Sequence, residues 1–232
     1  MNTNYFYTPP HNINDTILTL TEEEFHHCFN VLRTNIGEKI FVVDGRGNCY
    51  EAELFAKHAD FAEAKIIATH THFHEPTLSL TLAIGLLKNH AKFDFIVEKA
   101  TELGVKKIIP VITAHTIAHQ SKNARWEKLA LAAMKQCGRS FLPEISPPHS
   151  FDELIATQKN YHHKLIAYEY EPPGAEIKSS QSALVLIGSE GGFSSAEIEK
   201  GKRNGWQLIS LGERRLRTET AAIAVCAKFI DG

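Results

Sequence analysis

The sequence contains few cysteines, no long apolar run and little net charge. Four cysteines stand among 232 residues without C-x-x-C spacing, which disfavours a zinc site. No apolar run approaches the roughly 20 residues that a membrane helix requires. The formal net charge of -2 argues against a broadly basic surface that encloses nucleic acid, although it is compatible with a local basic patch.

The order of charged and apolar residues that marks a signal peptide is also missing, because the first residues, MNTNYFYTPPHN, are polar. We therefore expect a reducing, cytoplasmic setting and no membrane partner. Hydrophobic residues make up 43% of the chain and charged residues 22%, values typical of a folded globular protein rather than a disordered one.

The glycine loop (residues 188–193, GSEGGF) follows a short apolar run, residues 183–187, that predicts a buried strand. It is not a P-loop, since no Gly-Lys-Ser/Thr follows, and it does not match G-x-G-x-x-G near a first strand. It is not a nucleophile elbow either, because Ile187 stands where G-x-S-x-G needs its first glycine. A ligand held mainly by backbone groups in an apolar cleft remains.

The second loop (residues 211–217, LGERRLR) has the same context as the glycine loop. It follows a strand-like run at residues 207–210 and precedes a predicted helix. Two strand-loop-helix units in succession are typical of an α/β ligand site.

The remaining pattern predicts two domains, residues 1–74 and 75–232, with Pro76 at the change in composition. A β-rich first part is expected, with strands at 17–20, 39–43 and 50–55 and a turn at 44–48. Later strands are expected at 78–87, 107–112, 163–168, 183–187 and 207–210, and helices at 93–103, 124–137, 151–158, 194–204 and from 218. This alternation predicts an α/β fold with a mostly parallel sheet covered on both faces.

Local signals predict how several elements begin. Thr21 with Glu24 and Ser194 with Glu197 match the capping-box pattern, and Thr218 is expected to cap the last helix, with Glu219 in its first turn. Pro110 suggests an edge strand or a strand end.

Three histidines, His70, His72 and His74, would share one face of an extended chain. A metal site there is conceivable, but a polar strand end that runs into a linker explains the same pattern, and we expect no metal.

Four motifs in order resemble one known family. Residues 187–194 with 211–221 closely resemble the signature of the RsmE family, the 16S ribosomal RNA uridine N3-methyltransferases of the SPOUT class. Residues 99–105 and 136–139 match its internal motifs, and residues 26–33 with 44–48 match its N-terminal module. The resemblance covers nearly the whole chain.

The resemblance implies a small N-terminal PUA-like β-barrel that binds RNA and a C-terminal SPOUT-type α/β domain with a trefoil knot. It implies S-adenosyl-L-methionine as cofactor, 16S ribosomal RNA of the small ribosomal subunit as substrate, and a homodimer with the site close to the subunit interface. By position, the cofactor-binding residues would be Ala167, Tyr168, Gly188, Ser189, Gly191, Gly192, Leu211, Gly212 and Leu216.

Arg217 and Glu190 are the catalytic candidates. Arg217 would stabilise negative charge that develops on O2 or O4 of the uracil, because a guanidinium stays protonated, unless the residue is a surface arginine near the start of a helix. Glu190 would accept the N3 proton or bind the methionine amino group, unless it is a carboxylate favoured near the start of the following helix. Candidate phosphate contacts are Arg33, Lys88, Lys99, Arg125 and Arg139.

Three positions depart from the family pattern: Ser189 replaces the usual proline, Arg215 replaces an aliphatic residue, and Asn4 lies where an N-terminal arginine is common. These departures leave two alternatives open. One is a SPOUT methyltransferase for another RNA position, and the other is an RNA-binding or assembly protein without transfer activity.

Overall fold

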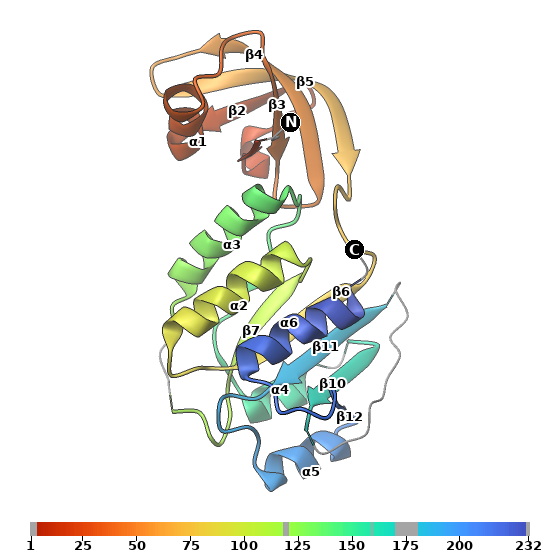
Figure 1. The fold of residues 1–232 in the computed structure, drawn as a ribbon. Helices are drawn as coiled ribbons and strands as arrows, with labels where there is room; N and C mark the ends of the chain where they lie inside the picture. The colour runs from red at the N-terminus through yellow and green to blue at the C-terminus, as the bar shows by residue number, and fades with distance from the viewer. Residues whose placement is uncertain (1–3, 118–120, 159, 170–180, 231–232) are drawn as a thin grey trace. The chain divides into compact units, whose positions relative to one another are not determined.

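The computed structural model describes residues 4–117, 121–158, 160–169 and 181–230. Contacts divide the chain into two compact units (Figure 1). The first unit is Met1–Glu75 with Leu131–Leu142, and the second is Pro76–Ala130 with Pro143–Gly232. The segment Leu131–Leu142, which lies inside the predicted second domain, therefore makes its contacts with the first unit.

The first unit is built on a five-stranded sheet with the order β1-β3-β4-β5-β2. β1 pairs with β3 in parallel, and the other pairs are antiparallel. Its elements are β1 (Tyr5–Tyr7), η1 (Pro10–Asn12), β2 (Ile17–Thr21), α1 (Glu22–His26), the π-helical turn η2 (His27–Val31), β3 (Lys39–Val43), β4 (Asn48–Lys57) and β5 (Phe61–Thr71).

The predicted strands β2, β3 and β4 are confirmed, as is the turn at residues 44–48. Asp44 organises this turn, because its carboxylate accepts hydrogen bonds from the backbone N–H groups of Arg46 and Asn48. β1 and β5 were not predicted. β5 reads FAEAKIIATHT, in which alanines and polar residues obscure the alternation that marks a strand.

The predicted capping box at Thr21 is wrong. Thr21 precedes α1, but its side chain forms no capping hydrogen bond. Glu24, which was expected to return to the Thr21 backbone, is instead paired with Lys135.

The second unit contains a sheet with the order β12-β10-β11-β6-β7-β8, and β9 also pairs with β7. Every pairing is parallel, which confirms the predicted parallel sheet. The strands are β6 (Ser79–Gly85), β7 (Lys107–Ile112), β8 (Glu144–Ile145), β9 (His149–Ser150), β10 (His163–Ala167), β11 (Ser182–Ile187) and β12 (Gln207–Ile209). The helices are α2 (His90–Glu102), α3 (Asn123–Cys137), which continues into the segment assigned to the first unit, α4 (Phe151–Thr157), α5 (Ser195–Arg203) and α6 (Thr218–Phe229).

Helices cover both faces of this sheet. α4 and α5 pack on one face, where Leu154 and Ile198 join a core that includes Ala83, Leu184 and Leu186 of the strands. α2 and α6 lie side by side on the other face (Figure 1). Successive strand residues point to opposite faces, so continuous apolar strands such as β6 and β11 can serve both cores.

Of the predicted caps in the second unit, one is confirmed and one is wrong. The Ser194 capping box is confirmed, with Glu197 bonded back to the Ser194 backbone. Thr218 is not the cap of α6: Arg217 occupies that position, and the Thr218 hydroxyl donates to the carbonyl of Gly188. Pro110 lies inside β7, an inner strand, rather than in an edge strand or at a strand end as expected. On the side of β7 that faces β8 and β9, residues 107 and 108 pair with β8, and residues 111 and 112 pair with β9. Pro110 falls between these pairs, so its missing N–H costs no hydrogen bond on that side.

No helix in the described part of the chain combines the length and apolar character needed to cross a membrane.

Candidate functional site

The glycine loop and the second loop lie at the same edge of the parallel sheet. The glycine loop leaves the carboxyl end of β11, and the second loop follows β12; these strands flank β10. Because all three strands run in parallel, their carboxyl ends meet at one edge, where α/β proteins bind ligands.

A cavity of about 780 Å³ opens at this edge. All nine predicted cofactor-binding residues line it, and so do Arg217 and Glu190, the two predicted catalytic residues. The structure thus brings together positions that are up to 50 residues apart in the sequence. The lining also includes seven residues that the sequence did not single out as site residues: Lys92, Glu169, Ile187, Phe193, Arg214, Thr218 and Ala221. Two more lining residues had other predicted roles. Glu219 was expected only to serve the helix start, and Arg215 was noted only as a departure from the family.

Close backbone packing explains the glycines of the first loop. A Cβ at Gly85, at the end of β6, would lie 2.3 Å from the backbone nitrogen of Ser189, and one at Gly188 would lie 3.1 Å from Cα of Gly192. Gly192 has φ of +67° and donates its N–H to the Ser189 carbonyl at 2.9 Å, which closes the loop as a tight turn. Gly85 was not predicted as part of the site.

The turn after β7 supports the glycine loop from outside. His115 Nδ1 lies 2.8 Å from the Gly191 carbonyl oxygen, and because a carbonyl only accepts, Nδ1 carries the proton. The Ala114 N–H donates to the carboxylate of Glu197 at 2.8 Å, and Glu197 also completes the capping box of α5. One carboxylate therefore fixes both the helix start and the supporting turn, a link that no local motif reveals.

The glycine loop is tied directly to the start of α6, the helix that follows the second loop. The Thr218 hydroxyl donates to the Gly188 carbonyl at 3.0 Å, which joins the start of α6 to the glycine loop. In the second loop the Gly212 N–H donates to the Ser210 hydroxyl at 3.2 Å. The Ser189 hydroxyl is buried and has no hydrogen-bond partner among the described residues.

Charged side chains stand around the cavity. Lys92 on α2 pairs with Glu219 on α6 at 2.9 Å, and Arg215 pairs with Glu169 at 3.4 Å. Glu190 is exposed and accepts the backbone N–H of Lys88 at 3.2 Å. Arg217 is exposed. Its backbone carbonyl accepts the Ala221 N–H at 2.8 Å, whereas its guanidinium makes no hydrogen bond or ion pair within the described part of the chain.

The carboxyl group of Glu219 has a shifted pKa. Burial raises this pKa, but the residue's own backbone N–H, the hydrogen bond from Lys92 and the charges of Lys92 and Arg217 together hold it below its ordinary value. The group is therefore ionised at neutral pH.

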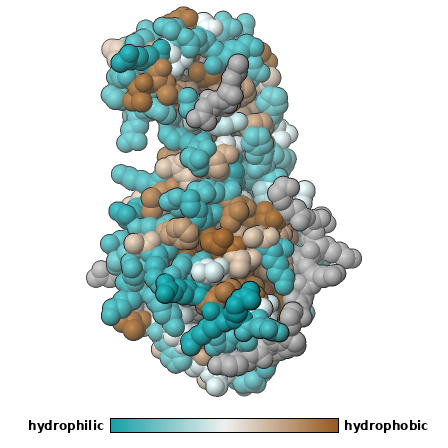
Figure 2. All heavy atoms as spheres, viewed as in Figure 1, coloured by the Kyte–Doolittle hydropathy of each residue, from teal (hydrophilic) through white to brown (hydrophobic). Residues whose placement is uncertain are grey.

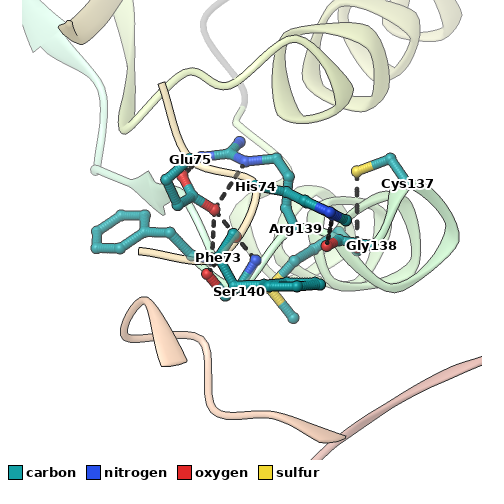
Figure 3. A network of polar contacts seen from close by, with 9 residues as sticks. Phe73, His74, Glu75, Cys137, Gly138, Arg139 and Ser140 are labelled. Atoms are coloured by element: carbon teal, nitrogen blue, oxygen red, sulfur yellow. Dashed lines mark hydrogen bonds and ion pairs between the residues drawn. The ribbon is translucent and has the colours of Figure 1, made fainter. Parts of the chain in front are cut away.

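The predicted phosphate contacts differ in exposure and in their partners. Arg33 is exposed in the first unit and Lys88 in the second, whereas Lys99 pairs with Glu98 and Glu102, and Arg125 pairs with Asp94. Arg139 is buried in an ion pair with Glu75 (Figure 3), so its guanidinium is directed to the protein rather than to solvent.

The three histidines have separate contacts. His70 packs against the ring of Phe73, and His74 Nδ1 lies 3.0 Å from the Gly138 carbonyl oxygen. Within the described residues, no group of three or more histidine, cysteine, aspartate or glutamate side chains is placed to hold a metal ion. His70 lies near the end of β5, and His72 and His74 follow that strand.

Two family models match the chain. One, described as an RNA methyltransferase domain, matches residues 74–230, and the other, described as an RNA methyltransferase PUA domain, matches residues 20–67.

Relatives and solved structures agree with these matches. The ribosomal RNA small subunit methyltransferase E of Mesomycoplasma hyopneumoniae is 35% identical over 72% of this chain and 76% of its own length. That of Synechocystis sp. is 31% identical over 95% of this chain and 75% of its own. The crystal structure of the Neisseria gonorrhoeae enzyme of that name, bound to S-adenosyl methionine, has a TM-score of 0.86 and 32% identity and covers 97% of this chain and 95% of that one. The chain therefore belongs to the ribosomal RNA small subunit methyltransferase E family, as the motifs in and after its two loops predicted.

Proposed function

We propose that this protein transfers a methyl group from S-adenosyl-L-methionine to N3 of a uridine in the 16S ribosomal RNA of the small ribosomal subunit. The observation that carries the proposal is the single cavity that unites both signature loops. Family membership supports the reaction, since the relatives are named ribosomal RNA small subunit methyltransferase E.

The cavity fits the cofactor in size and chemistry. Its volume of about 780 Å³ lies in the range of small-molecule sites, about 300–1,000 Å³. The glycines leave backbone groups uncovered for a ligand, and the buried Ser189 hydroxyl has no partner within the described residues. We propose that the nine residues predicted from the sequence hold the cofactor, which when bound supplies a methyl group on positively charged sulfur.

We propose that Arg217 acts on the RNA base. Uridine N3 carries a proton and is a poor nucleophile until that proton is removed, and its removal leaves negative charge on O2 and O4. The exposed guanidinium of Arg217 lines the cavity, which supports a role in stabilising that charge. Glu190 is assigned here to the second of its two predicted roles, contact with the cofactor's amino group, because it lies in the glycine loop.

We propose that residues 1–74 form a PUA-like RNA-binding domain and residues 75–232 a SPOUT methyltransferase domain with a trefoil knot. The family-model matches to a PUA domain and a methyltransferase domain support this division. Arg33, Lys88, Lys99 and Arg125 remain proposed phosphate contacts. Arg139 is proposed to stabilise the first unit instead, because its charge is buried with Glu75.

We propose a homodimer in the cytoplasm. Apolar side chains form a patch on the face that carries α2 and α6, as a comparison of Figures 1 and 2 shows. Phe95 and Leu103 of α2 are 44% and 36% exposed, and a second copy packed on this face would cover them. Analytical sedimentation of the wild type and of a Phe95→Glu variant tests this proposal. We expect the wild type to sediment as a dimer and the variant to dissociate more readily. A monomer at every concentration for both proteins would contradict the proposal.

Mass mapping of ribosomal RNA tests the proposed reaction. We expect 16S ribosomal RNA from cells that lack this protein to lose one 3-methyluridine, and the purified protein with S-adenosyl-L-methionine to restore it on isolated small subunits. Loss of a different methylated nucleotide would favour another RNA position. An unchanged modification map, with no binding of S-adenosylmethionine, would favour the non-catalytic alternative.

A further inference from the structure

Three charged side chains, from α2 and from the start of α6, line the cavity. Lys92 and Glu219 form an ion pair at 2.9 Å, and Arg217 lies two residues before Glu219 at the first turn of α6. The set combines two cationic side chains, which are hydrogen-bond donors, with one carboxylate, which is an acceptor.

Glu219 has an unused hydrogen-bond acceptor. Lys92 binds its Oε1 atom, whereas Oε2 is buried and has no partner among the described residues. Buried polar atoms nearly always have a hydrogen-bond partner, and leaving one without a partner is costly. An N–H group of a ligand in the cavity would meet this need.

The arrangement matches one edge of uracil. That edge presents a carbonyl oxygen, the N3–H donor and a second carbonyl oxygen in sequence. Its complement is donor, acceptor, donor, as a carboxylate between two cations provides. Cytosine has no hydrogen on N3, so a carboxylate would face a lone pair there and reject the base.

We propose, on the basis of the function proposed above, that Glu219 accepts the N3 hydrogen of the target uridine, while Lys92 and Arg217 face its two carbonyl oxygens. Glu219 is then both the residue that selects uridine over cytidine and the proton acceptor. The N3–carbon bond forms as the bond between the methyl carbon and the sulfonium sulfur breaks, with the N3 lone pair supplying the new bond. The N3 proton passes to Oε2 and from there to water.

The charge state of Glu219 suits this role. The same neighbours that lower the pKa of the carboxyl keep it deprotonated at neutral pH, so the acceptor is available before the base arrives. Lys92 fixes the other oxygen and leaves Oε2 as the atom that receives the proton.

A Glu219→Gln variant tests the proposal with two measurements. Single-turnover methylation of unmodified small subunits at saturating cofactor should fall about 100-fold or more, the lower range for loss of a general base. Its rate should then rise about tenfold per pH unit as hydroxide replaces the carboxylate. Calorimetric titration with S-adenosylhomocysteine should give an affinity within about threefold of wild type, because the side chain acts on the base.

The matched control is Glu199→Gln, an equivalent change at an exposed carboxylate on α5, and it should leave both measurements unchanged. A wild-type rate and pH profile for Glu219→Gln would overturn the proposal, and so would a large loss of S-adenosylhomocysteine affinity. If Glu219→Gln does not fold, Glu219→Asp replaces it, and an unchanged rate for that variant contradicts the proposal. A wild type that makes no 3-methyluridine instead overturns the proposed function, so the two failures are distinct.

Discussion

The carboxylate of Glu75 and the guanidinium of Arg139 form an ion pair in which the two side chains are only 1% and 3% exposed. Arg139 donates to both oxygens of Glu75, at 3.2 and 2.7 Å. The backbone N–H groups of Ser140 and Phe141 donate to the same carboxylate at 3.1 and 2.8 Å (Figure 3). Four donors thus compensate one buried negative charge and hold residues 138–141 against the end of the first unit's main segment.

We expect Glu75→Gln to lower the free energy of unfolding by about 3–5 kcal/mol, because it leaves the Arg139 charge buried without its partner. Denaturant unfolding provides the measurement. Glu51→Gln is the control, since Glu51 pairs with a mostly exposed Lys39 and its loss should cost less than about 1 kcal/mol. Equal effects of the two substitutions would contradict this account.

Gly85→Ala should abolish cofactor binding. The added Cβ would lie 2.3 Å from the Ser189 backbone nitrogen, so the glycine loop must shift. Titration with S-adenosylhomocysteine measures the effect. Gly201→Ala is the control, because its Cβ would crowd only the terminal Cδ1 of Ile166, at 2.5 Å, and would lie at ordinary contact distance, 3.9 Å, from Trp206 Cβ. It also lies within a helix, which favours alanine. If Gly85→Ala binds S-adenosylhomocysteine with wild-type affinity, the end of β6 is not part of the cofactor site.

His115→Phe should weaken S-adenosylhomocysteine binding about three- to tenfold. The phenyl ring keeps the bulk of the side chain but cannot donate to the Gly191 carbonyl, and one such hydrogen bond contributes about 0.5–1.5 kcal/mol. The expected kcat at saturating cofactor is close to wild type, since His115 only positions the loop. His58→Phe, on the first unit, serves as the control, and a fall in kcat alone would assign His115 a different role.

Arg217→Ala should lower kcat about 100- to 1,000-fold, as expected when a donor to a developing anion is lost. Binding of S-adenosylhomocysteine should not change. Arg217→Lys should recover part of the rate because it keeps the charge, and Arg203→Ala on α5 should behave as wild type. A wild-type kcat for Arg217→Ala would exclude a transition-state role.

The sequence by itself determined the parallel α/β unit, the two loops and the family. Continuous apolar strands, capping residues and glycines at strand ends are local signals, because each depends on neighbours close along the chain. The nine cofactor positions, which the family resemblance implied, all line one cavity because parallel strands bring the ends of their strand-loop units to one edge. β5 escaped prediction because its alanines and polar residues carry no clear alternation.

Only the tertiary structure decided which distant side chains meet. His115 and Gly191, Lys92 and Glu219, and Glu75 and Arg139 are 64 to 127 residues apart, and nothing local encodes their contacts. Arg139 illustrates the difference, since a lone arginine in a sequence is equally suited to phosphate or to a buried carboxylate. Burial and partner geometry select between those roles, and both arise only when the chain has packed.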